Sequence, residues 1–178
     1  CDYLAIELGE HLAAYTEEKF KWYGNFRIVN DDFETYDFGT EKFDMVFSAA
    51  TIQWIPEQIA FQKSFDLLNS GGSLMMMLQL GDYKTPNEKL FNEIQKVYEK
   101  YFRPEVPYTQ KLVYENAVNY GFTDFKRLEF YGKREYTADE YVEYIGTHCD
   151  HIVLSNQYKS KFYDGIRAAA LNAGNRIC

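Results

Sequence analysis

The chain is poor in cysteine, and this shortage excludes two classes of small stabilised domain. Its 178 residues hold three cysteines, Cys1, Cys149 and Cys178. They are odd in number and lack the close spacing of metal ligands, so we expect neither a disulfide framework nor a zinc site, and no metal. Sparse cysteine suits a reducing compartment, and we expect a cytoplasmic protein.

Positive charge is also in short supply. Nineteen Lys and Arg stand against 27 Asp and Glu, which gives a net charge of −8. Nucleic-acid binding requires a dense basic face that neutralises phosphates, and no basic cluster here is long enough. The longest apolar run, residues 73–80, is too short to span a bilayer, and the chain opens without a signal-peptide pattern. We therefore expect neither nucleic acid nor membrane as a partner.

Two glycine signatures of enzymes are absent from the sequence. It contains no Gly-x-Ser-x-Gly motif, which disfavours a serine hydrolase. It also contains no Gly-x-Gly-x-x-Gly motif, which disfavours a dinucleotide-dependent oxidoreductase, although such enzymes share a parallel sheet and an acidic strand end.

Aromatic residues, by contrast, are abundant at 18%, with 16 tyrosines, many of them in the second half. Amphipathic helices that bury rings and leave hydroxyls in water explain most of them. The alternative is an aromatic-walled pocket for a small, partly apolar substrate.

Apolar runs alternate with helical patterns along the chain, which predicts an α/β fold with a parallel sheet. The expected strands are residues 3–6, 26–29, 43–48 and 73–80, with one or two more within 122–136. The expected helices are residues 10–22, 56–68, 87–101, 109–120, 137–145 and 156–172. Thr137 followed by Glu140 predicts a capping box at the start of the helix over 137–145. We expect one domain in three segments: an α/β core at 1–81, a helical insertion or lid at 82–120, and strand and helices at 121–178 that complete the domain.

Acidic or small polar residues follow three of the expected strands. Glu7 follows the first, Asp32 the second, and Ser48 with Ala49 the third. Ligands of parallel sheets bind beyond the carboxyl ends of the strands, where a carboxylate can accept hydrogen bonds from ribose hydroxyls. Each residue alone could be a solvated turn former. Together they favour nucleoside binding.

The order of these motifs resembles a known family. Residues 4–10 (LAIELGE), 30–34 (NDDFE), 43–54 and 67–77 are similar to the successive motifs of class I S-adenosylmethionine-dependent methyltransferases. The similarity is greatest to the small-molecule group of types 11, 12 and 25, and residues 136–151 resemble the C-terminal helical part of that group. The resemblance implies a Rossmann-like sheet, S-adenosylmethionine as cofactor and methyl transfer to a small-molecule acceptor.

The resemblance also implies roles for single residues in cofactor binding. Glu7 would hold the ribose hydroxyls, and Leu8 would pack against adenine. Asp32 would bind the adenine amino group, and the backbone of Phe33 would read the ring edge. The methionine end of the cofactor would be lined by Ser48 and Ala49.

Substrate and base candidates lie further along the chain. Gln53 and Trp54 are expected near the transferred methyl group or the substrate mouth, with Tyr144 as a further substrate contact. A general base is needed only where the acceptor must lose a proton, and His148 and His151 are the candidates. For both histidines a helix-end or surface position is the competing interpretation.

The sequence departs from the family in two places. The glycine-rich loop after the family's first strand is absent, and residues 175–178 stand about where the family's last long strand would begin, so strands 1 and 7 of the order 3-2-1-4-5-7-6 would be missing. We therefore expect a fragment, with the gap in the sheet filled by another segment or by another copy, as a homodimer or by strand exchange. The alternative function is a non-catalytic, degenerate nucleotide-binding or self-associating α/β module.

Overall fold

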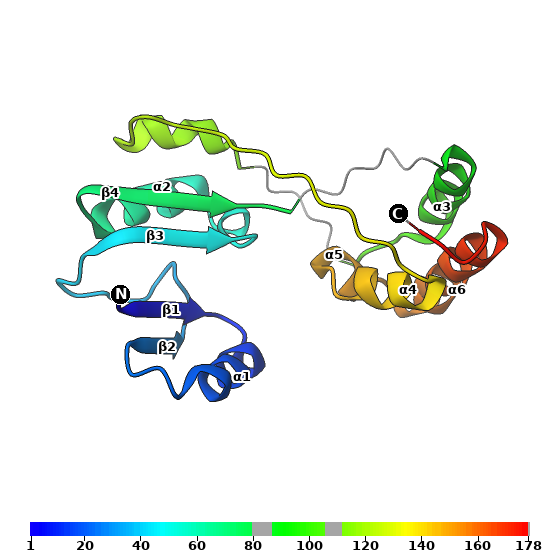
Figure 1. Cartoon of the computed structure of the whole chain (residues 1–178), viewed down its shortest axis with the longest axis horizontal. Coiled ribbons are helices and arrows are strands. Elements are labelled where there is room, and N and C mark those ends of the chain that lie inside the picture. Colours follow the sequence, from blue (N-terminus) through cyan, green and yellow to red (C-terminus); the bar gives the residue numbers. More distant parts are fainter. Residues whose placement is uncertain (80–86, 106–111, 178) are drawn as a thin grey trace. The chain divides into compact units, whose positions relative to one another are not determined.

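The computed structural model describes residues 1–79, 87–105 and 112–177. The chain forms two compact units (Figure 1). Unit 1 consists of Cys1–Leu78 with Lys111–Phe125, and unit 2 of Gln79–Gln110 with Lys126–Cys178. Residues 82–120, expected as one helical insertion, are thus divided between the two units.

Unit 1 contains four parallel strands in two pairs. They are β1 (Tyr3–Glu7), β2 (Phe26–Asn30), β3 (Phe43–Ala49) and β4 (Leu68–Met77). β1 pairs with β2 from Tyr3↔Phe26 to Glu7↔Asn30, and β3 pairs with β4 up to Ala49↔Met77. All four arrows point the same way, so the carboxyl ends of the strands lie on one side of the unit (Figure 1).

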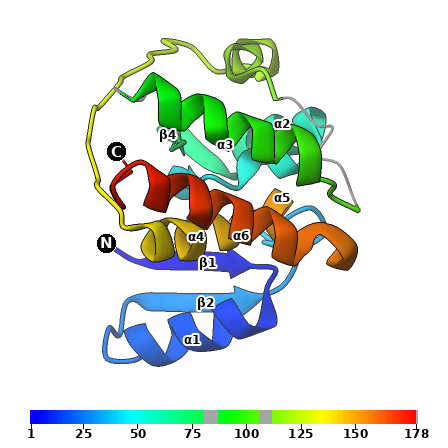
Figure 2. The same cartoon turned by 90° about the vertical axis from the view of Figure 1, so that its right-hand side faces the viewer.

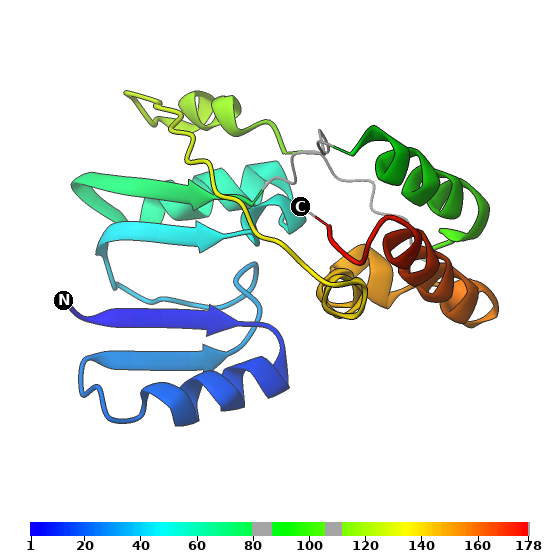
Figure 3. The same ribbon diagram turned by 45° about the vertical axis from the view of Figure 1, so that its right-hand side comes forward.

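The two pairs are separate sheets. Among the residues that the structure describes, no ladder joins β1 to β3, although β1 is the strand nearer to β3 in both views (Figures 1 and 3). A family sheet without its first strand would break at this place, between the second and fourth strands of the family order. The α/β class with an incomplete Rossmann-like sheet is therefore confirmed.

Helices cover one face of the β3-β4 pair. They are α2 (Glu57–Leu67) with the short 3₁₀ helices η1 (Ile52–Trp54) and η2 (Tyr114–Tyr120), while α1 (Glu10–Phe20) connects β1 to β2. Phe61 and Ala60 of α2 are fully buried against Leu74 and Met76 of β4. The opposite face carries four exposed apolar side chains: Met45, Phe47, Met75 and Met77.

Unit 2 is helical, with α3 (Glu88–Tyr101), α4 (Ala138–Gly146), α5 (Cys149–Ile152) and α6 (Asn156–Asn172). α3 and α4 both pack on α6 (Figure 2), around a core that includes Ile145, Phe162 and Ile166. None of the helices in the described ranges has both the length and the apolar character that a membrane span requires.

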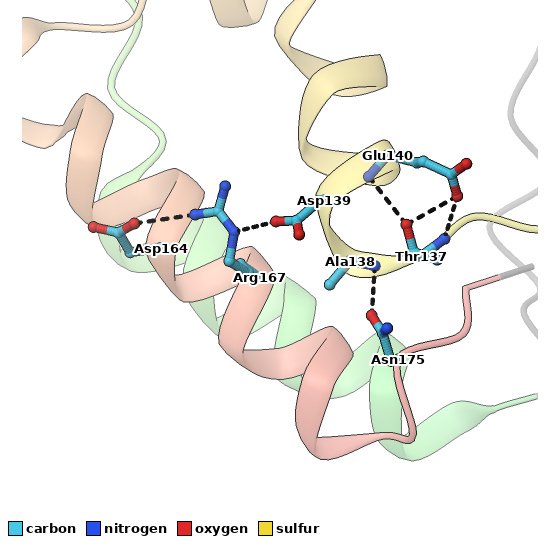
Figure 4. A network of polar contacts seen from close by, with 7 residues as sticks. All are labelled: Thr137, Ala138, Asp139, Glu140, Asp164, Arg167 and Asn175. Atoms are coloured by element: carbon cyan, nitrogen blue, oxygen red, sulfur yellow. Dashed lines mark hydrogen bonds and ion pairs between the residues drawn. The ribbon is translucent and has the colours of Figure 1, made fainter.

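The predicted capping box at Thr137 is confirmed. The Thr137 hydroxyl accepts from the Glu140 amide while the Glu140 carboxylate accepts from the Thr137 amide, at 2.8 Å (Figure 4). Arg167 of α6 donates to Asp139 of α4 at 2.7 Å, and the Asn175 side chain accepts from the Ala138 amide. These contacts fix the start of α4 against α6.

The prediction of one or two strands within residues 122–136 is wrong. Apart from one antiparallel bridge between Tyr136 and Ile177, this segment has no ladder partner in the part of the chain that the structure describes. Its alternating apolar side chains stay exposed, with Phe130 at 90%. Alternation marks a strand only where a neighbouring strand and an apolar layer can receive it. The helix expected at 109–120 is the 3₁₀ helix η2, and the start of the expected range lies outside the described residues.

Candidate cofactor-binding site

Asn30, the last residue of β2, ties the carboxyl end of that strand to the end of β1. Its Nδ2 atom donates to the carbonyl oxygens of Glu7 at 2.8 Å and Leu8 at 3.1 Å. The Asp31 amide also donates to the Glu7 carbonyl oxygen, at 3.2 Å. The two strand ends are thus held in fixed relation. Sequence reasoning missed Asn30, and its position directly before the Asp31-Asp32 pair was the available signal.

The Glu7 carboxylate is fixed by the start of α1. Its Oε1 atom accepts from the Gly9 amide at 2.7 Å, and Gly9 precedes the first residue of the helix. A Cβ at Gly9 would lie 3.0 Å from that oxygen, so glycine permits the close approach. Helix N-termini attract negative charge, which adds to the contact. Next to this carboxylate stands Leu8, an apolar side chain that is 73% exposed.

Asp32 organises the turn after β2. Its Oδ1 atom accepts from the Glu34 amide at 2.8 Å, and its carbonyl oxygen accepts from the Tyr36 amide at 2.8 Å. A side-chain bond to the backbone two residues on is the Asx-turn geometry. The turn fixes the backbone of Phe33, which lies between the bonded positions.

The turn after β3 is held by its own side chains. Ser48 Oγ accepts from the Ile52 amide at 2.9 Å, and Thr51 Oγ1 donates to the Ala49 carbonyl oxygen at 3.0 Å. Gln53 Nε2 donates to the carbonyl oxygen of Ala50, at 2.9 Å. Trp54 ends η1 with a side chain that is 41% exposed. Ser48 thus shapes the turn that follows Ala49, the last residue of β3, and leads to Gln53.

His151 lies in the core of unit 2 and is 4% exposed. Its Nδ1 atom lies 2.6 Å from Asp150 Oδ1, and its Nε2 atom lies 2.7 Å from the Tyr98 hydroxyl. Burial lowers the pKa of His151, while the Asp150 carboxylate opposes this shift. The atoms of His148, Asp150 and His151 that could bind a metal lie within 4.8 Å of one another, but both His151 nitrogens are engaged.

Tyr144 belongs to an aromatic group at the same end of unit 2. Its ring stacks on Tyr136 at 5.0 Å between centroids and meets His148 edge-on at 4.8 Å. Its hydroxyl accepts from Gln79 Nε2 at 3.4 Å. The predicted residues therefore form two sets. The cofactor positions with Gln53 and Trp54 belong to unit 1, whereas Tyr144 and the two histidines belong to unit 2.

Comparison with known proteins agrees with the geometry of unit 1. Residues 1–76 match the family model for a methyltransferase domain. A curated relative, malonyl-[acyl-carrier protein] O-methyltransferase 1 of Ilyobacter polytropus, is 28% identical over 109 residues. Residues 1–76 are therefore similar to the methyltransferase-domain family, in line with the resemblance to the class I S-adenosylmethionine-dependent methyltransferases. This match supports S-adenosylmethionine as the cofactor of the predicted site.

The methyltransferase match covers 61% of this chain and 37% of the curated relative, so the chain spans well under half the length of that protein. Two solved structures are similar at low level. The StiE O-MT fragment, residues 942–1257, has a TM-score of 0.42 at 14% identity and covers 98% of this chain and 56% of its own. PKMT2 from Rickettsia typhi, in complex with AdoHcy, has a TM-score of 0.39 at 11% identity; the match covers 98% of this chain and 42% of the PKMT2 chain.

The residues of unit 1 fit the adenosine part of the cofactor. The Glu7 carboxylate, held at the end of β1, suits the ribose hydroxyls. The Asp32 Asx turn at the end of β2 suits the adenine edge, and the exposed apolar side chain of Leu8 suits the adenine face. The roles of single residues remain predictions.

Proposed function

We propose that the protein transfers a methyl group from S-adenosylmethionine to a small-molecule acceptor, and that the carboxyl ends of β1, β2 and β3 bind the cofactor. One observation carries the proposal: Asn30 joins the ends of β1 and β2 by hydrogen bonds, so that the backbone that carries the Glu7 carboxylate and the Asp32 turn is held in place. Rigid, preorganised groups bind a ligand without first losing conformational freedom.

Each strand end supplies one part of the binding site. The Glu7 carboxylate accepts hydrogen bonds from the ribose hydroxyls, and Leu8 packs on adenine. The Asp32 carboxylate accepts from the adenine amino group while the backbone of Phe33 reads the ring edge. The methionine end lies along the last two residues of β3, Ser48 and Ala49.

S-adenosylmethionine supplies an electrophilic methyl group, which the acceptor atom takes by in-line displacement from sulfur. The protein contributes alignment and the exclusion of water. Gln53 and Trp54 border the transfer end, and Tyr144 contributes to acceptor binding. An acceptor that must lose a proton requires a base, for which we propose His148 or His151. Because both His151 nitrogens are engaged, His151 acts through the hydroxyl of Tyr98.

The curated relative is named as a malonyl-[acyl-carrier protein] O-methyltransferase. A carboxylate acceptor is therefore a specific candidate for this protein. An ionised carboxylate needs no base, so this acceptor would leave both histidines without a role in proton transfer. The sparse cysteines favour a cytoplasmic protein.

Ligand titration tests the cofactor assignment. We expect the protein to bind S-adenosylhomocysteine and not NAD in isothermal titration calorimetry, and Glu7→Gln to weaken binding of the former. Binding of NAD alone, or unchanged affinity in Glu7→Gln, would contradict the proposal. A metabolite screen for S-adenosylhomocysteine release then identifies the acceptor, and cofactor binding without any turnover favours the non-catalytic alternative.

For the partner we propose a second copy of this chain. Among the described residues no ladder pairs the facing edges of β1 and β3, and the β3-β4 face exposes Met45, Phe47, Met75 and Met77. Such edges template strand pairing, and such faces favour association. Analytical ultracentrifugation should show concentration-dependent dimers, and a monomer at every concentration would refute this proposal.

A further inference from the structure

Lys63 of α2 reaches into the loop that follows β2. Its Nζ atom donates to the carbonyl oxygen of Tyr36 at 2.7 Å and to that of Glu34 at 3.2 Å. The same ammonium group lies 5.3 Å from the ring centre of Phe33 and 5.4 Å from that of Phe38. One side chain thus contacts four residues of the seven that follow Asp31.

The loop has few other anchors to the rest of unit 1. The Asp32 bonds to Glu34 and Tyr36 are internal to the loop, and so is the edge-on contact of Phe38 with Tyr36 at 4.7 Å between ring centres. Phe38 also meets Phe43 at the start of β3, at 6.0 Å. Internal bonds set the shape of a loop but not its place, and Lys63 supplies a polar connection to a helix.

The helix that carries Lys63 is a firm base. Phe61, two residues before it, is fully buried, and Ser64, directly after it, is 1% exposed. Lys63 is itself half-buried. A charged donor makes stronger hydrogen bonds than a neutral one, and a cation over aromatic faces adds to them. The ammonium is therefore committed to the loop rather than presented to a substrate.

We propose that Lys63 is a positioning residue that holds the Asp32–Phe38 loop in the conformation that recognises adenine. This inference rests on the proposed function, since it assumes that Asp32 and Phe33 contact the adenine edge. Loss of the ammonium would let the loop shift. It would weaken the discrimination between adenine and other purines while changing the stability of the fold less.

Lys42 provides a matched control. It lines the same surface hollow of about 420 Å³ as Lys63. Its Nζ atom donates to the Asp66 carbonyl oxygen of α2, whereas among the described residues Lys63, not Lys42, bonds to the loop carbonyls of Glu34 and Tyr36. Lys42→Met therefore removes a neighbouring charge from the hollow without removing the bonds that hold the loop.

The test compares S-adenosylhomocysteine with its inosine analogue, which carries a keto oxygen in place of the adenine amino group. We expect Lys63→Met to weaken S-adenosylhomocysteine binding by about tenfold and to bring the affinity ratio of the two ligands close to one. Lys63→Arg, which retains a charged donor, should restore most of the ratio. Lys42→Met should leave it unchanged. A wild-type ratio in Lys63→Met, or an equal loss in Lys42→Met, would overturn the proposal.

Hydrogen exchange in the absence of ligand separates this inference from the proposed function. The Thr35 and Tyr36 amides should exchange faster in Lys63→Met than in Lys42→Met, while the melting temperatures of the two variants stay close. If the wild-type protein does not bind S-adenosylhomocysteine, the proposed function fails. Unchanged exchange at these two amides shows instead that Lys63 does not hold the loop.

Discussion

Replacing Asp32 by Asn isolates the proposed contact with the adenine amino group. Asn retains a side-chain oxygen that can accept from the Glu34 amide, as Oδ1 of Asp32 does at 2.8 Å. Asx turns form with either residue, so the loop keeps its shape. The other carboxylate oxygen becomes an amide NH₂ group, which is a donor where the adenine amino group also donates.

The structure sets the size of the effect. A hydrogen bond to a charged group contributes about 1.5 to 3 kcal/mol, or roughly 10- to 150-fold in affinity. Asp32 is half-buried, so solvent weakens the bond. We therefore expect the dissociation constant for S-adenosylhomocysteine to rise by about 10- to 30-fold in Asp32→Asn.

The inosine analogue supplies the reverse comparison. Its keto oxygen accepts a hydrogen bond, so Asp32→Asn should bind it more tightly than the wild-type protein does. Isothermal titration calorimetry of both proteins with both ligands measures the four affinities. Equal affinity of wild type and variant for both ligands would refute the assignment of Asp32 to the adenine edge.

Three further predictions concern stability, measured by thermal or urea unfolding of the full chain. Phe61→Ala should cost about 3 to 5 kcal/mol, because the side chain is fully buried; a loss below about 1 kcal/mol contradicts the described core. Gly121→Ala should lower the free energy of unfolding by about 1 to 2 kcal/mol, because Gly121 has a φ of 99° and a Cβ there would lie 2.8 Å from the Phe65 ring. Gly24→Ala serves as the control, since a Cβ at Gly24 would meet no atom within 4 Å. Burial holds the pKa of His151 below its unfolded value of 6.5, so the contribution of neutral His151 to the free energy of unfolding is full above pH 6.5 and is lost as the pH falls toward the folded pKa. His151→Gln should flatten this loss of stability on the acid side. An unaltered pH profile of stability would contradict the role given to His151.

Local patterns were enough to predict much of the fold. Short apolar runs bounded by polar turns located all four strands of unit 1, although β4 begins at Leu68 rather than at residue 73. The Thr137 capping box located the start of α4, and the last helix was predicted with the bounds that the structure shows, Asn156–Asn172. In each case the signal lies within a few neighbouring residues.

What failed depends on residues that are distant in sequence. The segment 122–136 has the alternation of a strand, but apart from the Tyr136–Ile177 bridge it has no strand partner among residues 1–79, 87–105 and 112–177, and no local signal reveals this. The contacts of Asn30 with β1 and of Lys63 with the loop after β2 each join residues more than 20 positions apart. The sequence identified the acidic strand ends but not the side chains that hold them.

Hydrogen exchange of the protein with and without S-adenosylhomocysteine tests the central claim most directly, because it locates the ligand as well as detecting it. With S-adenosylhomocysteine bound, we expect slower amide exchange in three segments at the ends of β1, β2 and β3: residues 7–9, 31–36 and 48–53. NAD at the same concentration should protect none of them. Binding that leaves these three segments unprotected, or no binding at all, would contradict the account.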